Sequence, residues 1–89
     1  MTVVPDSNLV RQIVLRTFSE LNGSPVDVRS LREMILIDDG KYRGRSYRFS
    51  DLMAMWLVKF GVIQVYDEEG RMLRTINLFE EQDSLKRAA

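Results

Sequence analysis

Residues 57–65 read LVKFGVIQV, and the glycine in this stretch separates two apolar segments of different kinds. The segment from Asp51 to Phe60 is apolar at most positions and follows Ser50, a residue type favoured at helix N-caps, so it predicts a helix. After Gly61 the residues become β-branched and aromatic, which is typical of a strand. The stretch therefore predicts a helix that ends at Gly61 and continues directly into a strand.

The strand after Gly61 is predicted to form a β-hairpin over residues 62–78. Asp67 and Gly70 in the sequence DEEG suit a type I turn followed by a left-handed glycine bulge, which sets Asp67 opposite Arg71. We expect the face of the hairpin that carries Ile63, Val65, Leu73 and Thr75 to meet the core. The predicted pairs are Val65 with Leu73, Ile63 with Thr75, Tyr66 with Met72, Gln64 with Arg74 and Val62 with Ile76.

Two further helices are predicted upstream of the apolar segment. Apolar residues recur at helical spacing from Leu9 to Leu21, after three candidate N-cap residues at positions 6–8 and before Gly23, which offers a left-handed stop. A second, shorter apolar stripe predicts a helix from Val28 to about Leu36, closed by the sequence DDG at 38–40.

Three helices followed by a hairpin resemble the winged-helix variant of the helix-turn-helix superfamily. The resemblance is carried by the stripe at 9–21, PVDVRSLREMI at 25–35, SDLMAMWLVKFGVI at 50–63 and the hairpin at 62–78. It implies an α+β fold, a three-helix winged-helix-like domain with a C-terminal β-hairpin wing. It also implies nucleic-acid binding, with the third helix in a major groove and the wing against the backbone. The outward face of that helix offers only Lys59 as a cation, and the wing tip is acidic.

Length and composition favour one domain over residues 1–89, with a winged-helix-like core at 7–78 and a polar tail at 79–89 that is frayed or disordered. Thirteen basic and thirteen acidic residues balance, and the chain has no His and no Cys. Disulfides, thiolate metal sites and the commonest general base are therefore excluded. We expect no enzyme, cofactor, metal or small-molecule substrate. No signal-type or membrane-spanning run is present, so a cytoplasmic protein without a membrane partner is expected.

The sequence KYRGRSYRF at 41–49 breaks both periodicities and is interpreted as a loop. Its cations would neutralise phosphates and its Tyr side chains would stack on unpaired bases, which predicts DNA or RNA binding. The alternative is that the aromatic residues Tyr42, Tyr47 and Phe49 fold inward while the cations pair with Asp38 and Asp39. The candidate nucleic-acid contacts are Lys41, Tyr42, Arg43, Arg45, Tyr47 and Arg48 in this segment, with Lys59, Arg71 and Arg74 in support.

Protein interaction or homodimerisation is the competing hypothesis. The third predicted helix is apolar on nearly every side, and the hairpin carries an apolar pair beside polar residues. The candidate contacts are Met55, Trp56, Tyr66 and Met72, although the helix residues have a core interpretation as well.

Overall fold

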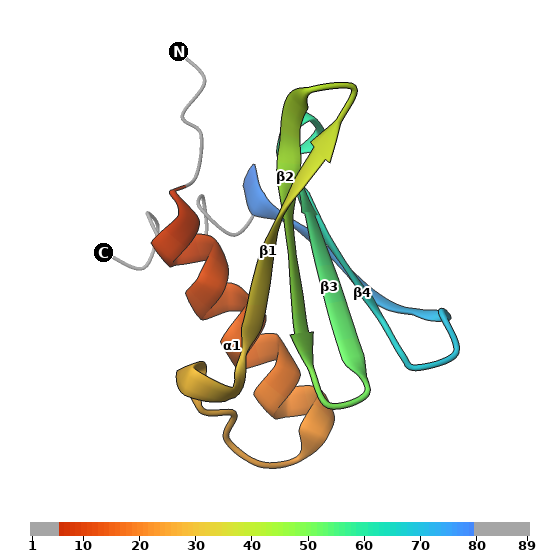
Figure 1. Ribbon diagram of the computed structural model, residues 1–89. Coiled ribbons are helices and arrows are strands. Elements are labelled where there is room, and N and C mark those ends of the chain that lie inside the picture. Colours follow the sequence, from red (N-terminus) through yellow and green to blue (C-terminus); the bar gives the residue numbers. More distant parts are fainter. Residues whose placement is uncertain (1–5, 80–89) are drawn as a thin grey trace.

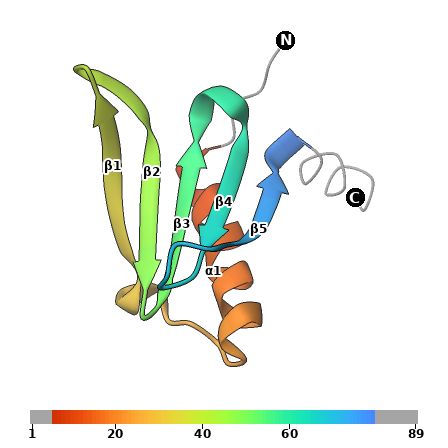
Figure 2. The same ribbon diagram turned by 90° about the vertical axis from the view of Figure 1, so that its right-hand side faces the viewer.

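The computed structural model describes residues 6–79, which form one α-helix and a five-stranded antiparallel sheet. The elements are α1 (Ser7–Asn22), η1 (Val28–Ser30), β1 (Arg32–Asp38), β2 (Lys41–Phe49), β3 (Leu52–Leu57), η2 (Val58–Phe60), β4 (Val62–Tyr66) and β5 (Met72–Asn77). The strand order is β1-β2-β3-β4-β5, so each strand pairs with its neighbour in sequence. Figure 1 shows α1 against one face of the sheet, and Figure 2 shows the opposite face, which no helix or strand of residues 6–79 covers.

The first predicted helix is confirmed. The Asp6 side chain caps α1 by accepting a hydrogen bond from the Leu9 N–H at 2.8 Å, and Gly23 ends the helix with a left-handed φ of 79°. One stripe of α1 is buried against the sheet; it comprises Val10, Ile13, Val14, Thr17 and Phe18. The amphipathic pattern and the two caps therefore act as the sequence predicts.

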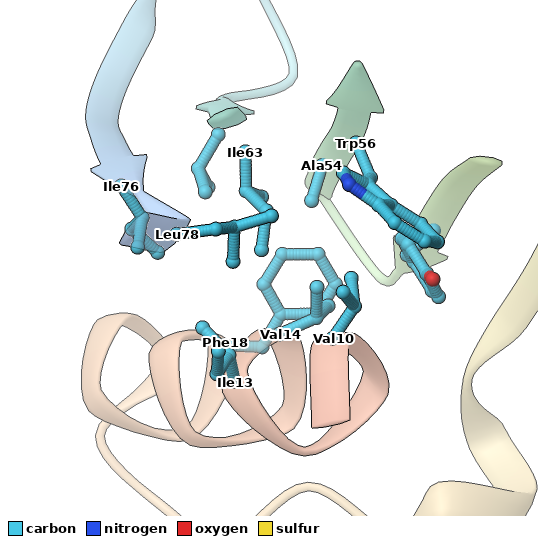
Figure 3. Packing of buried hydrophobic residues seen from close by; sticks show 11 residues of the cluster. Val10, Ile13, Val14, Phe18, Ala54, Trp56, Ile63, Ile76 and Leu78 are labelled. Carbon is cyan, nitrogen blue, oxygen red and sulfur yellow. The ribbon is translucent and has the colours of Figure 1, made fainter. Parts of the chain in front are cut away.

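The core lies between α1 and the inner face of the sheet (Figure 3). Side chains from strands β2 to β5 meet the helix stripe there: Tyr47, Ala54, Trp56, Ile63, Val65 and Ile76, joined by Leu78 just beyond β5. The burial of Ile63 and Val65 confirms the predicted core face of β4. The prediction is wrong for β5, because Leu73 and Thr75, expected on that face, are exposed and Ile76, expected on the other face, is buried. Because strand side chains alternate between faces, the residues between these core positions point away from α1.

The winged-helix prediction is wrong, because the second and third predicted helices are absent from residues 6–79. The segment at 28–36 forms η1 and most of β1, and the segment at 51–60 forms β3 and η2. Residues 6–79 form one α-helix and a five-strand meander, so the resemblance to a three-helix winged-helix domain does not hold.

The turn at Asp39 and Gly40 explains the first error. Both residues have positive φ, 53° and 73°, and they connect the paired residues Asp38 and Lys41. Such a two-residue Asp-Gly turn matches the right-handed twist of paired strands. Gly also ends helices, and the sequence prediction assigned Gly40 that role.

The two-sided apolar character of β3 explains the second error. A short run without polar alternation fits a buried helix and a strand equally well. Ser50 is no N-cap: it has a φ of 51° in a two-residue turn that joins the paired residues Phe49 and Leu52. Pairing with β2 on one side and β4 on the other fixes the strand conformation of β3.

The β4–β5 hairpin is confirmed, with a change of register. Asp67 donates its backbone N–H to the Arg71 carbonyl at 2.9 Å, and Gly70 is left-handed with a φ of 82°. Tyr66 pairs with Met72 as predicted. A bulge at Leu73 then shifts the remaining pairs, so Val65 meets Arg74, Gln64 meets Thr75, Ile63 meets Ile76 and Val62 meets Asn77. The predicted tail at 79–89 lies outside the described residues except for Phe79.

Candidate functional site

Residues 41–49 form strand β2, so the expected loop is wrong and strand alternation separates its side chains. Tyr47 is fully buried beneath α1, as the inward-folding alternative predicted for it. Arg45 lies on the same face as Tyr47, whereas Arg48 lies on the opposite face. Tyr42 stays about half exposed near the β1–β2 turn. The strand therefore divides its aromatic and basic side chains between two faces, and Arg45 donates to the Tyr42 hydroxyl at 3.4 Å.

Most of the candidate cations are paired with carboxylates. The ion pairs are Arg43 with Asp38 at 3.9 Å, Arg45 with Glu33 at 3.2 Å, Arg71 with Asp67 and Glu69 at 2.9 Å each, and Arg74 with Glu20 at 2.6 Å. Lys41, Arg48 and Lys59 are exposed, and the Lys59 ammonium lies 6.0 Å from the centre of the Phe60 ring. The favourable charge that a phosphate would use is partly neutralised within the protein.

A polar cluster of Arg11, Glu33, Arg45 and Tyr47 ties α1 to β1 and β2. Arg11 donates to both Glu33 carboxylate oxygens, at 2.9 and 3.4 Å. Burial by itself would raise the pKa of Glu33, but the hydrogen bond from Arg11 and the charges of both arginines outweigh it, so this pKa lies below its usual value. Burial and the neighbouring Glu33 charge raise the pKa of Tyr47. The cluster has a structural role: the two arginines stabilise the charged form of Glu33, and the ion pairs connect α1 with β1 and β2.

Replacing Glu33 with Gln is expected to lower the urea midpoint of unfolding at pH 7 and to flatten its acid dependence. The folded-state pKa of Glu33 is depressed, so its charge stabilises the fold above the unfolded pKa of about 4.3. That stabilisation disappears as pH falls through the folded-state pKa. Urea titrations from pH 7 to pH 3 measure the difference, with Glu68→Gln at the exposed β4–β5 turn as control. If the urea midpoints of wild type and Glu33→Gln differed by the same amount at every pH, the charge of Glu33 would not be the source of the stabilisation.

The uncovered face of the sheet carries the strongest candidate site. Ala54 and Val65 are buried under α1, so their strand neighbours point to the other side. We call these partly exposed apolar residues the apolar strip: Leu36 from β1, Met53, Met55 and Leu57 from β3, and Val62 and Tyr66 from β4. Tyr66 donates its hydroxyl to Gln64 on the same face at 2.8 Å. Figure 2 views the sheet from this side, with α1 behind it.

A hollow of about 450 Å³ opens at one end of the apolar strip. Gly44 pairs with Leu36 on one side and Leu57 on the other, so β2 contributes no side chain between these two residues. A Cβ at Gly44 would overlap the backbone carbonyl of Trp56. The hollow is lined by Leu36, Ile37, Asp38, Arg43, Met55, Leu57, Lys59 and Phe60. It is an apolar depression whose charged side chains are Arg43, Lys59 and Asp38.

The remaining sequence-predicted contacts lie apart from one another. Met55 and Tyr66 belong to the apolar strip, while Trp56 is a core residue with 4% exposure and Met72 is exposed on the edge strand β5. Only Arg43, Met55 and Lys59 among the predicted residues meet at the hollow. Sequence reasoning missed Gly44 and Leu36. The sequence LMAMWL at 52–57 could have indicated this surface, because it is apolar at both odd and even positions and would give a strand two apolar faces.

Residues 6–79 contain no helix long and apolar enough to cross a membrane. The same residues bring together no group of three or more acidic side chains placed to hold a metal ion. No protein-family model, curated protein or solved structure matches this chain. The function proposed below therefore depends on the geometry of the chain itself.

Proposed function

We propose that this chain is a non-enzymatic protein-interaction module that binds an acidic amphipathic segment of another protein on its apolar strip. One observation carries the proposal: β3, the central strand, is apolar on both faces although α1 covers only one of them. Strands with two apolar faces usually belong to sheets covered on both sides. We assign to the partner the role of covering the second face of β3, which residues 6–79 leave uncovered.

The residues of the apolar strip suit a surface that accommodates another chain. Met53 and Met55 are unbranched and flexible, so they adapt to different apolar side chains. Contiguous exposed apolar groups with a polar rim are typical of interaction sites. Strand β2 adds only Gly44 and Ser46 between the apolar residues of β1 and β3, which leaves space for inserted side chains.

The cations at the hollow favour an acidic flank in the partner. Arg43 and Lys59 lie there, and Arg43 also pairs with Asp38 at 3.9 Å. At the other end of the apolar strip, Arg48 and Met53 share a depression with Asp51, Asp67 and Glu68. A partner segment with apolar side chains at its centre and Asp or Glu at the flank that meets the hollow complements this arrangement. Charge complementarity of this kind mainly accelerates association and selects the partner.

Two synthetic amphipathic helical peptides of the same length test the proposal, one with Leu and Glu and one with Lys in place of every Glu. We expect the acidic peptide to bind at least about tenfold more tightly. Amide shifts in ¹⁵N-labelled protein should concentrate on Met53, Met55 and Leu57. Met55→Lys should weaken binding although it adds a favourable charge, because it removes apolar contact. Gln12→Lys adds the same charge on the exposed side of α1 and should not weaken it.

Equal affinity for both peptides, or shifts confined to α1 or β5, would overturn this proposal. Nucleic-acid binding is the second proposal, favoured by the exposed cations Arg48 and Lys59 on the side of the apolar strip. A single-stranded oligonucleotide distinguishes the two, because phosphate binding weakens steeply with salt whereas apolar binding does not. Retention of the oligonucleotide that falls with salt and is lost in an Arg48→Glu, Lys59→Glu variant would favour the second proposal.

A further inference from the structure

Strand β1 forms an edge of the sheet that lacks the usual protection against pairing. It has seven residues, REMILID, with no Pro and with charges only near its ends. Its pairing with β2 shifts register between Leu36 and Ile37, but the extra residue, Arg43, belongs to β2 and not to β1. Three of its apolar side chains are more than half exposed: Met34 at 65%, Ile35 at 55% and Ile37 at 68%. Natural edge strands usually carry central charges, Pro or bulges that prevent pairing with another chain. Figure 2 shows β1 at the free edge of the sheet, beside β2.

The opposite edge provides a contrast within the same sheet. Strand β5 contains the bulge at Leu73, and its central residue Arg74 is paired with Glu20 of α1. Both features interrupt the regular edge that an added strand requires. The two edges therefore differ, and β1 is the one suited to accept a strand.

The sequence of β1 is self-complementary in one antiparallel register. When Ile35 lies opposite Ile35 of a second copy, Arg32 faces Asp38 of that copy, and the second copy's Arg32 faces Asp38 in turn. Met34 then faces Leu36, and both lie on the same side of the sheet. If Met34 lies opposite Met34 instead, Asp38 faces Ser30, and if Leu36 lies opposite Leu36, Asp38 faces Met34. In both registers the two pairs between Arg32 and Asp38 are lost.

We infer that two copies of this chain associate by antiparallel pairing of their β1 strands, centred on Ile35. The two-fold axis is perpendicular to the sheet, so five strands from each copy form one continuous sheet with both helices on the same side. The interface buries the exposed Ile35 and Met34 side chains. It uses the edge of β1 and touches the apolar strip only at Leu36. The strip residues of β3 and β4 stay outside the interface, so a failure of the partner binding proposed above would leave this inference standing.

Charge reversal tests this inference, with mass measured by sedimentation equilibrium. Wild type should be a dimer. Arg32→Asp sets two acidic residues opposite each other at both ends, and Asp38→Arg sets two basic residues there, so each should weaken the dimer roughly 100-fold. The swap variant Arg32→Asp, Asp38→Arg should restore it. A mixture of the two single variants should form a heterodimer, because both pairs between positions 32 and 38 are then of opposite charge.

Apolar substitutions provide the matched controls. Ile35→Lys places two cations at the two-fold axis and should give a monomer. Leu73→Lys on β5 and Met55→Lys on the apolar strip should leave the dimer intact. A wild type that stays monomeric at about 1 mM would overturn the inference. A dimer that persists in the Ile35→Lys variant would also overturn it. The same holds if Met55→Lys, which leaves the sequence of β1 unchanged, abolishes the dimer.

Discussion

Replacing Trp56 with Lys is expected to abolish the cooperative unfolding transition, whereas replacing the preceding Met55 with Lys leaves the fold intact. Trp56 has 4% exposure and packs into the core opposite α1, while Met55 points to the uncovered face. An unpaired charge in the core and the loss of a large aromatic side chain together should lower the free energy of unfolding by more than about 4 kcal/mol. At Met55 the lysine reaches water, so the expected change is about 1 kcal/mol or less.

Far-UV circular dichroism during thermal unfolding measures both Lys variants, because Trp56→Lys removes the only tryptophan. Val65→Lys and Gln64→Lys repeat the comparison on β4, where Val65 is fully buried and Gln64 lies on the uncovered face. Equal destabilisation within each pair would contradict a sheet covered on one side only. The test therefore examines both the strand assignment and the exposure of the apolar strip.

Replacing Gly44 with Ala is expected to lower the free energy of unfolding by at least about 2 kcal/mol. A Cβ at this position would overlap the Trp56 carbonyl oxygen, and Gly44 has a φ of 155° that other residues rarely adopt. Backbone atoms cannot rotate away as a side chain can, so β2 and β3 would have to separate. Urea unfolding followed by Trp56 fluorescence measures the change.

Ser46→Ala is the matched control for Gly44→Ala. Ser46 lies two residues along the same strand and on the same face, between Met34 and Met55. Its replacement should change stability by about 0.5 kcal/mol or less. A Gly44→Ala variant as stable as Ser46→Ala would show that the close approach of β2 to Trp56 does not exist. Such a result would also remove the reason for the hollow beside Leu36 and Leu57.

The sequence predicted those elements that local interactions specify. Helix α1 has a regular apolar stripe, an Asp cap at its start and Gly23 at its end, so residues within a few positions of each other determine it. The hairpin at 62–78 follows from Asp67 and Gly70 in one turn. Even there, the bulge at Leu73 shifted the register by one residue, because its position depends on how β5 packs against α1.

The strands β1 to β3 were predicted incorrectly because their local signals have two meanings. Gly40 serves a helix end or a tight turn, and LMAMWL fits a buried helix or a strand. The choice depends on hydrogen bonds between β2 and both of its neighbours, which a periodicity within one segment does not reveal. The sequence also shows that residues 41–49 are basic. That their side chains alternate between the two faces of the sheet became visible only in the structure.

By itself, the sequence determined an amphipathic N-terminal helix, a C-terminal hairpin and the absence of His and Cys chemistry. Tertiary structure decided that Tyr47 is buried, that Arg45 is held by Glu33, and that the second face of β3 remains uncovered. The physical reason is that caps and turns are satisfied by neighbouring residues. Strand pairing, ion pairs and exposure depend instead on residues distant in the chain.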